Sequence, residues 1–276
     1  MIRHQPKSET DFVTLTGGAC AILLTSDAAK KAQLSWDLAA DWLSRKLSRI
    51  GKKRPPKRPL RPRLPVLMPA RNMPRRRPNS IRGRLAFMHA IAHIELNAID
   101  LAWDIIARFR SPDLPVAFYD DWVNVANDEA RHFSMLTNYL SYNNACYWDF
   151  PAHNSLWESA ENTSDDILSR LAIVPLVLEA RGLDTTPGAI KRLSATGDTK
   201  AARILKIIGE EEISHVATGV RWFHHICKSR ELEPASTFQM LVKSQFAGFL
   251  KPSFATNART LAGFPRFYYE PLARLR

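Results

Sequence analysis

The chain has 276 residues, which is enough for one large domain or for a domain with an extension. Its formal net charge is +12, but residues 1–84 carry +15 and residues 85–276 carry −3, so the basic excess belongs to the N-terminal third. Three cysteines lie far apart without a CxxC pair, which excludes a disulfide-rich secreted scaffold and a cysteine zinc site.

Residues 1–50 predict an N-terminal helical appendage of two short helices, not a targeting segment. Glu9 and Asp11 disrupt the basic region that a signal peptide requires. Ser35 is a candidate N-cap for the second helix. No apolar run in the chain approaches the roughly 18–20 residues of a membrane span, so we expect a cytoplasmic location and no membrane partner.

Residues 51–79 form a basic linker that separates this appendage from the rest of the chain. Residues 51–78 contain eight prolines and eleven Lys or Arg residues, and proline prevents a helix, so an extended conformation is expected. The linker is interpreted either as an arm that grips phosphates or an acidic partner, or as a solvated connector along the surface. Its lack of aromatic residues weakens a single-stranded nucleic-acid function. The candidate arm residues are Arg54, Lys57, Arg58, Arg61, Arg63, Arg75, Arg76 and Arg77.

Residues 80–276 predict an all-α domain. Apolar residues recur at helical spacing in four long segments: residues 80–109, 111–142, 163–182 and 198–228. A short turn makes the first two helices an antiparallel hairpin, and residues 143–162 are long enough for a crossover along a bundle. Gly182 is expected to end the third helix, and another helix follows Pro234. The predicted fold is a ferritin-like four-helix bundle of two antiparallel hairpins joined by a long crossover, with the N-terminal appendage and a C-terminal helix added.

A pattern of one glutamate followed by Glu-x-x-His occurs twice in these helices, at nearly equal spacing. The first glutamates lie 34 and 33 residues before their Glu-x-x-His motifs. Residues three apart share one helix face, and each candidate lies in an apolar stripe, where an unpaired carboxylate is costly. One Glu from each of two helices and Glu-x-x-His from the other two form the ligand set of a dinuclear carboxylate site. The predicted ligands are Glu95, Glu129, His132, Glu179, Glu212 and His215.

The charge of this set also favours a metal site. Four glutamates would repel one another in one core, and two divalent ions would balance them. Mixed imidazole and carboxylate ligation suits iron, manganese or zinc. We hypothesise that Glu129 and Glu212 bridge the two ions. Asp128 and Glu211 each precede a motif glutamate and are proposed to accept the second N–H of a histidine ligand, the alternative being ordinary surface carboxylates.

Two residues indicate irregular packing next to the predicted ligands. Pro175 lies four residues before Glu179 and is expected to distort the third helix, which would re-aim the ligand. Gly219 lies one turn after His215. It either leaves space for a substrate or dioxygen near the metals, or permits a close helix crossing.

These motifs resemble known families. The sequence DEARH at 128–132, with Glu212-x-x-His215, resembles the ferritin-like di-iron carboxylate superfamily, and its D-E-x-R-H form is similar to bacterial multicomponent monooxygenases. Most of the chain, including the linker, resembles a bacterial family called domain of unknown function 455, in the segments HAIAHIELNAID (89–100), FYDDW (118–122), LAIVPLVLEARGLD (171–184) and AGF (262–264). This resemblance implies a ferritin-like bundle without an established activity.

Three functions are open at this point. The first is a non-haem di-iron oxidase or monooxygenase that uses two iron ions and dioxygen on a small-molecule substrate, with an electron-donor protein and no catalytic residue beyond the ligands. The second is metal or oxidant handling as a ferroxidase, a peroxidase or a manganese catalase, with manganese or a mixed manganese–iron pair. The third is a tRNA-modifying di-iron hydroxylase or a nucleic-acid-binding protein, which only the basic segment supports. A homodimer is also open.

Overall fold

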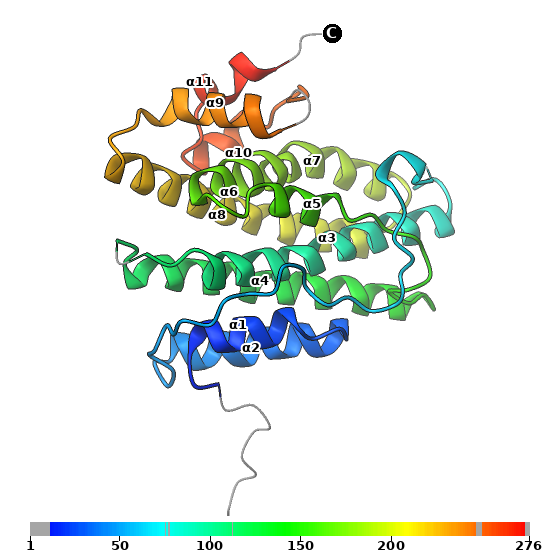
Figure 1. Ribbon diagram of the computed structural model, residues 1–276. Helices are drawn as coiled ribbons and strands as arrows, with labels where there is room; N and C mark the ends of the chain where they lie inside the picture. Colours follow the sequence, from blue (N-terminus) through cyan, green and yellow to red (C-terminus); the bar gives the residue numbers. More distant parts are fainter. Residues whose placement is uncertain (1–11, 75, 77, 112, 247–249, 274–276) are drawn as a thin grey trace, which may run out of the picture. The chain divides into compact units, whose positions relative to one another are not determined.

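The chain is all-helical in the part that the structure describes. This computed structural model describes residues 12–74, 76, 78–111, 113–246 and 250–273 (Figure 1). Within those residues the extended pairing is limited to two isolated bridges, between Leu67 and Ala152 and between Leu250 and Ala273. The predicted all-α class is therefore confirmed.

The helices follow one another along the chain with few long interruptions. They are α1 (Leu15–Leu23), α2 (Ala28–Leu43), η1 (Ala70–Asn72), α3 (Ile81–Arg108), α4 (Val116–Tyr142), α5 (Ser155–Asn162), α6 (Ile167–Ile173), η2 (Val174–Glu179), α7 (Ala180–Ala195), α8 (Thr199–Ser229), α9 (Pro234–Gln245), α10 (Thr256–Leu261), α11 (Arg266–Tyr269) and η3 (Glu270–Leu272). The element η2 is a π-helix, whereas η1 and η3 are short 3₁₀ turns. The four long segments expected from periodicity correspond to α3, α4, the continuous run from α6 to α7, and α8.

The chain divides into two compact units. One contains residues 1–62 and 99–130, and the other contains residues 63–98 and 131–276. The boundary falls inside α3 and α4, so each of these helices contributes residues to both units. The predicted division at residues 50 and 79 stays a prediction.

In the first unit, a buried serine joins α2 to residues of α3 and α4. Ser35 is fully buried; its Oγ accepts a 2.7 Å hydrogen bond from Trp103 Nε1 and donates a 3.1 Å bond to the carbonyl oxygen of Ala126. The expectation that Ser35 caps this helix was wrong. Asp27 is the N-cap and accepts a 2.7 Å hydrogen bond from the amide of Lys30.

The start of the basic linker lies against the helices of the same unit. The amide of Leu60 donates a 2.8 Å bond to the carbonyl of Leu23, and Lys31 Nζ donates to the carbonyl of Leu60 at 3.1 Å. Lys31 also donates to Asp100 Oδ1 at 2.6 Å, and Arg61 Nη2 lies 3.0 Å from Asp100 Oδ2. Burial lowers the pKa of Lys31, and the charge of Asp100 opposes that shift. This part of the linker forms no helix, as its prolines predict, and is anchored on a buried ionic cluster.

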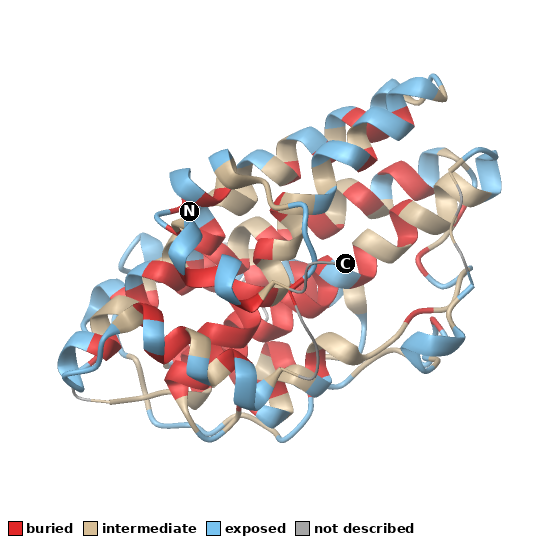
Figure 2. Cartoon of the chain, turned by 90° about the horizontal axis from the view of Figure 1, so that it is seen from above, coloured by how far each residue is buried: buried red, intermediate tan, exposed pale blue. Residues whose placement is uncertain are grey.

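The second unit is built around α8 and the run from α6 to α7, which pack against each other (Figure 1). Contrary to the sequence prediction, Gly182 does not end this run but lies inside α7, which continues to Ala195. Helices α9 and α10 pack on α8, and α9 also packs on α6. Buried residues follow the inward sides of these helices, as the red segments in Figure 2 show.

Helix α3 is the one described helix that is long and apolar enough to cross a membrane by length and composition. The sequence interpretation had found no such stretch. In the structure, 72% of its apolar window is buried inside the protein, as in a core helix.

The three cysteines are free thiols, as their spacing predicts. Cys20 and Cys227 are buried and Cys146 is partly exposed. Burial raises the pKa of the Cys227 thiol to about 11, so this thiol is protonated and unreactive near neutral pH.

Candidate metal centre

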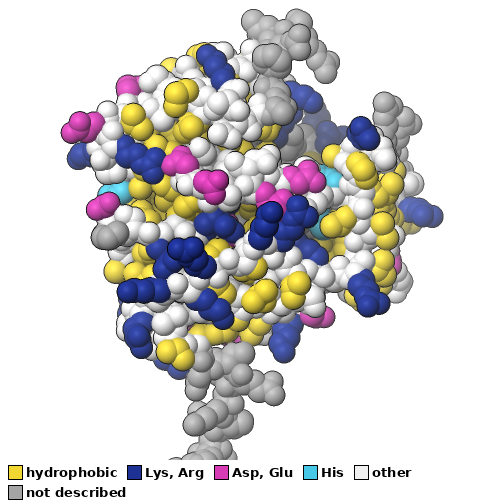
Figure 3. Space-filling model, in the orientation of Figure 1, with side chains coloured by type: hydrophobic (Ala, Val, Ile, Leu, Met, Phe, Trp, Pro, Cys, Tyr) yellow, Lys and Arg dark blue, Asp and Glu magenta, His cyan; other side chains and the backbone are white. Residues whose placement is uncertain are grey.

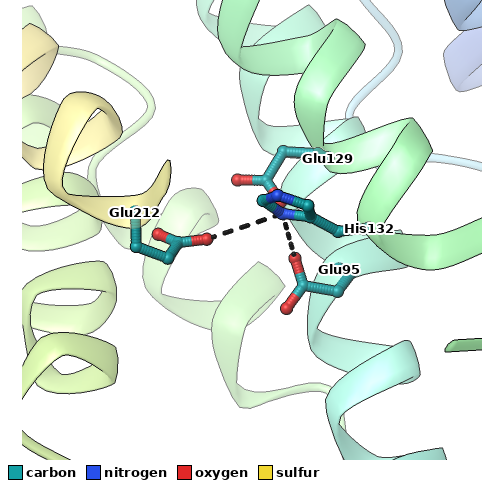
Figure 4. A group of neighbouring side chains, drawn as sticks. All are labelled: Glu95, Glu129, His132 and Glu212. Atoms are coloured by element: carbon teal, nitrogen blue, oxygen red, sulfur yellow. Dashed lines mark ion pairs between the residues drawn. The ribbon is translucent and has the colours of Figure 1, made fainter. Parts of the chain in front are cut away.

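Three helices place acidic and imidazole side chains at one point. Helix α3 carries Glu95, α4 carries Glu129 and His132 one turn apart, and α8 carries Glu212 (Figure 4). One potential ligand atom from each of these four residues lies within 4.8 Å of all the others. Glu95, Glu129 and His132 are buried, and Glu212 is half-buried. Four ligands at this separation can surround a metal ion.

The Nδ1 atom of His132 faces the carboxylates. It lies 3.3 Å from Glu95 Oε2 and 3.9 Å from Glu212 Oε1, as the dashed lines in Figure 4 mark. On α8, His215 Nδ1 lies 3.5 Å from the same Oε1 of Glu212, and His215 is 1% exposed. The Oε1 atom of Glu212 therefore lies close to the Nδ1 atoms of both histidines.

The other nitrogen of His132 is held by a carboxylate from α8. His132 Nε2 lies 2.7 Å from Glu211 Oε2, and Arg131 Nη2 donates to the same oxygen at 2.6 Å. Because a carboxylate that is paired with an arginine only accepts hydrogen bonds, Nε2 of His132 is the donor in this contact, and Nδ1 is the nitrogen that faces the carboxylates. Glu211 thus lies at the position predicted for an acceptor next to the ligands.

Two predicted site residues, Glu179 and Asp128, do not belong to the group of four. Glu179 is the last residue of η2 and is half-buried. Asp128 precedes Glu129 on α4 and is half-buried. The roles of Glu179 as a ligand and of Asp128 as a hydrogen-bond acceptor stay predictions.

The helix that leads to Glu179 is distorted where the sequence suggested. Residues 174–179 form a π-helix that contains Pro175. Gly219 of α8 crosses close to it, because a Cβ atom at Gly219 would lie 2.5 Å from Pro175 Cβ and 2.8 Å from its Cγ. A close helix crossing therefore explains Gly219, and the alternative of open space for dioxygen is not needed.

Two further histidines on α3 have protein partners and do not belong to the group of four. His89 Nε2 lies 2.5 Å from the carbonyl oxygen of Tyr147. His93 Nδ1 lies 2.7 Å from Tyr147 Oη, and its Nε2 lies 3.1 Å from the carbonyl of His153. Burial lowers the pKa values of His89 and His153, which keeps both rings neutral.

Some of the candidate arm residues are exposed, and others contact the rest of the protein. Arg54, Lys57, Arg58 and Arg63 are exposed, whereas Arg75 and Arg77 lie outside the described residues. Arg61 is 14% exposed and pairs with Asp100, and Arg76 Nη2 donates a 3.2 Å bond to the carbonyl of Pro151. Figure 3 shows Lys and Arg side chains gathered in groups on one face, with apolar side chains between them.

The donor set of the group of four could hold a divalent metal ion. Carboxylate oxygens and imidazole nitrogens in one buried cluster match the ligands of iron, manganese and zinc, whereas calcium and magnesium prefer oxygen alone. Without cations, carboxylates held this close would repel one another. Sequence reasoning missed Arg131 as the partner of Glu211, although the Arg in the first motif was visible.

Comparison with known proteins gives a family but no activity. A family model described as "Protein of unknown function (DUF455)" matches residues 24–270. An uncharacterized protein of Haemophilus influenzae is 40% identical over 208 residues, which are 74% of this chain and 72% of that protein. No solved structure gives a significant match.

Proposed function

We propose a function for this chain, which belongs to the DUF455 family: it is a dinuclear metal protein that activates dioxygen to oxidise or hydroxylate a small organic molecule. The observation that carries the proposal is the convergence of Glu95, Glu129, His132 and Glu212 within 4.8 Å. The second Glu-x-x-His motif supports two ions over one, because His215 lies beside Glu212.

The proposed ligands are the six predicted residues, and the proposed metals are two iron ions, with manganese or a mixed pair as the alternative. Helices α3, α4, α6–α7 and α8 would then form a ferritin-like bundle. Bound ferrous ions would supply the electrons that reduce dioxygen. An electron-donor protein would complete a catalytic cycle, and the free cysteines favour the cytoplasm as its location.

The residues of this chain fix the ligands before any metal binds. Glu211 sets the tautomer of His132, and Arg131 holds Glu211 with a 2.6 Å hydrogen bond. Apolar packing keeps water from the buried carboxylates, so their charges act at low dielectric. These contacts hold the ligand atoms in place, which lowers the reorganisation that metal binding requires.

The alternative functions gain less support. Arg61 and Arg76, two of the proposed arm residues, make contacts inside the protein. Only the exposed cations of the linker therefore support the tRNA hypothesis. Among the described residues, the thiols of Cys20, Cys146 and Cys227 are free and scattered, which disfavours a peroxidase with an additional cysteine-ligated iron.

The test is a dioxygen-dependent reaction of the ferrous protein. Anaerobic protein that is loaded with two equivalents of ferrous ion and then mixed with dioxygen is expected to change its optical spectrum and to consume dioxygen. The variant E212Q is expected to lose both responses, whereas E210Q, altered at a neighbouring exposed residue, is expected to retain them. Iron that binds stoichiometrically without either response would contradict an oxidase, and manganese in the isolated protein would favour the catalase alternative.

A further inference from the structure

A second candidate site lies in the second unit, where the segment after α9 meets α7. A pocket of about 230 Å³ lies there, and apolar side chains that include Leu178, Phe246 and Phe254 form much of its wall. Three cationic residues, Arg181, Lys251 and Arg259, line the same pocket. An apolar chamber with convergent charges of one sign is typical of a site for a small charged ligand.

The guanidinium of Arg259 has donors to spare. Arg259 is 2% exposed; its Nε donates to Asp184 Oδ1 at 2.9 Å, and its Nη2 donates to Asp184 Oδ2 at 2.8 Å and to the carbonyl of Ala180 at 3.3 Å. A guanidinium has five N–H donors, and these bonds use those on Nε and Nη2. Nη1 is buried and makes no hydrogen bond. An acceptor is therefore missing at a buried cation that lines the pocket.

Aromatic rings do not replace that acceptor. The guanidinium carbon of Arg259 lies 4.5 Å from the ring centroid of Tyr269 and 5.1 Å from that of Phe254. Such contacts stabilise the positive charge, but they are weaker than a hydrogen bond to an anion. Asp184 balances one of the three cations, so the pocket keeps an excess of positive charge.

This pocket is separate from the candidate metal centre. None of the residues that line the pocket is one of the six proposed ligands. Arg181 donates a 2.8 Å bond to the carbonyl of Lys251, which ties α7 to the segment that closes the pocket.

We propose that this pocket binds a small amphipathic carboxylate. The carboxylate would accept from Nη1 of Arg259, the nitrogen that Asp184 and Ala180 leave unused, and would pair with the charges of Arg181 and Lys251. The apolar body would lie against Leu178, Phe246 and Phe254. The volume is below the roughly 300 Å³ at which pockets for drug-sized ligands begin, which favours a medium-chain acid over a larger lipid.

Titration calorimetry of the purified protein with octanoate tests the proposal, with acetate and 1-octanol as matched probes. Octanoate is expected to bind one equivalent per chain, and acetate and 1-octanol at least tenfold more weakly, because each lacks one half of the ligand. No saturable octanoate binding would overturn the proposal. Equal binding of acetate would indicate an anion site that does not recognise the alkyl chain. Equal binding of 1-octanol would indicate an apolar surface that does not recognise the carboxylate. Either outcome contradicts an amphipathic carboxylate site.

Variants locate the binding. R181Q and K251Q are each expected to weaken octanoate binding at least tenfold. K251Q removes only a charge, because the bond from Arg181 goes to the backbone carbonyl of residue 251 and is kept. K243Q, which alters an exposed lysine of α9 outside the pocket, is expected to bind like the unaltered protein. E212Q is expected to keep full octanoate binding, so this result is independent of the metal centre. Unchanged affinity in both R181Q and K251Q would overturn the assignment.

Discussion

The contact between His132 and Glu211 sets the chemistry of the candidate centre at the scale of single residues. Glu211 is 34% exposed and Arg131 is 37% exposed at their side chains, whereas His132 is fully buried. The pair therefore forms a short polar path from the surface to His132, one of the proposed ligands. It also fixes which imidazole nitrogen faces the carboxylates.

Removal of this acceptor is expected to weaken metal binding. In E211A, His132 loses its partner on Nε2 and can adopt the wrong tautomer, so the affinity for ferrous or manganous ion should fall about 10- to 100-fold. E210A is the matched control, because Glu210 is 66% exposed at its side chain and pairs only loosely with Lys206, at 3.9 Å. Chelator competition measures both affinities. Equal losses in the two variants, or no loss in E211A, would argue against this role of Glu211.

His89 provides a contrasting prediction, because it is a buried histidine outside the centre. Burial lowers its pKa from the usual 6.5. His89 therefore binds a proton more readily in the unfolded chain than in the folded protein. Its contribution to the stability of the fold is complete above pH 6.5 and is lost as the pH falls through the pKa of the folded state. H89F is expected to flatten the loss of stability on the acid side, as measured by urea unfolding at several pH values. Its metal content should equal that of the unaltered protein, and a lower content would place His89 in the centre.

At the scale of elements, the π-helix and Gly219 form one packing unit. The ring of Pro175 is closed onto its own backbone nitrogen, so it cannot swing away from a larger residue at 219 as a flexible side chain would. The π-helix ends at Glu179, so this crossing also controls the aim of a proposed ligand.

The substitution G219A is expected to destabilise the protein by about 1–3 kcal/mol, because overpacking outweighs the helix propensity of alanine. G182A is the control: nothing lies within 4 Å of a Cβ at Gly182, so alanine should stabilise α7 by up to about 1 kcal/mol. Thermal or urea unfolding measures both. If G219A were as stable as G182A, the crossing would be looser than the structure indicates.

Most of the helices follow from sequence periodicity, and the errors have physical causes. Gly182 suggested a helix end, but a glycine costs a helix only about 1 kcal/mol, which packing of α7 against α8 overrides. Ser35 suggested a cap, yet its hydroxyl has a buried partner in Trp103 that no local pattern reveals. The approach of Pro175 to Gly219 also depends on residues far apart in the sequence.

At the scale of the whole molecule, features that depend on residues close in the sequence could be predicted, whereas contacts between distant segments could not. The proposed ligands were visible because repeated spacing on long helices places them at similar heights. The contacts of the basic linker could not be predicted, because Arg61 pairs with Asp100, which lies in α3, far away in the sequence. The pocket around Arg259 was missed for the same reason, since its wall combines residues between 177 and 184 with Phe246 and residues between 250 and 259.

The central claim is that this chain holds two metal ions. Protein that is produced with iron and manganese both supplied, and then analysed for elements and for anomalous scattering at each absorption edge, tests it most directly. The account predicts two ions per chain beside Glu129 and Glu212, with a clear loss in E129Q and none in E210Q. Purified protein with no bound ion, or ions bound away from these residues, would contradict it.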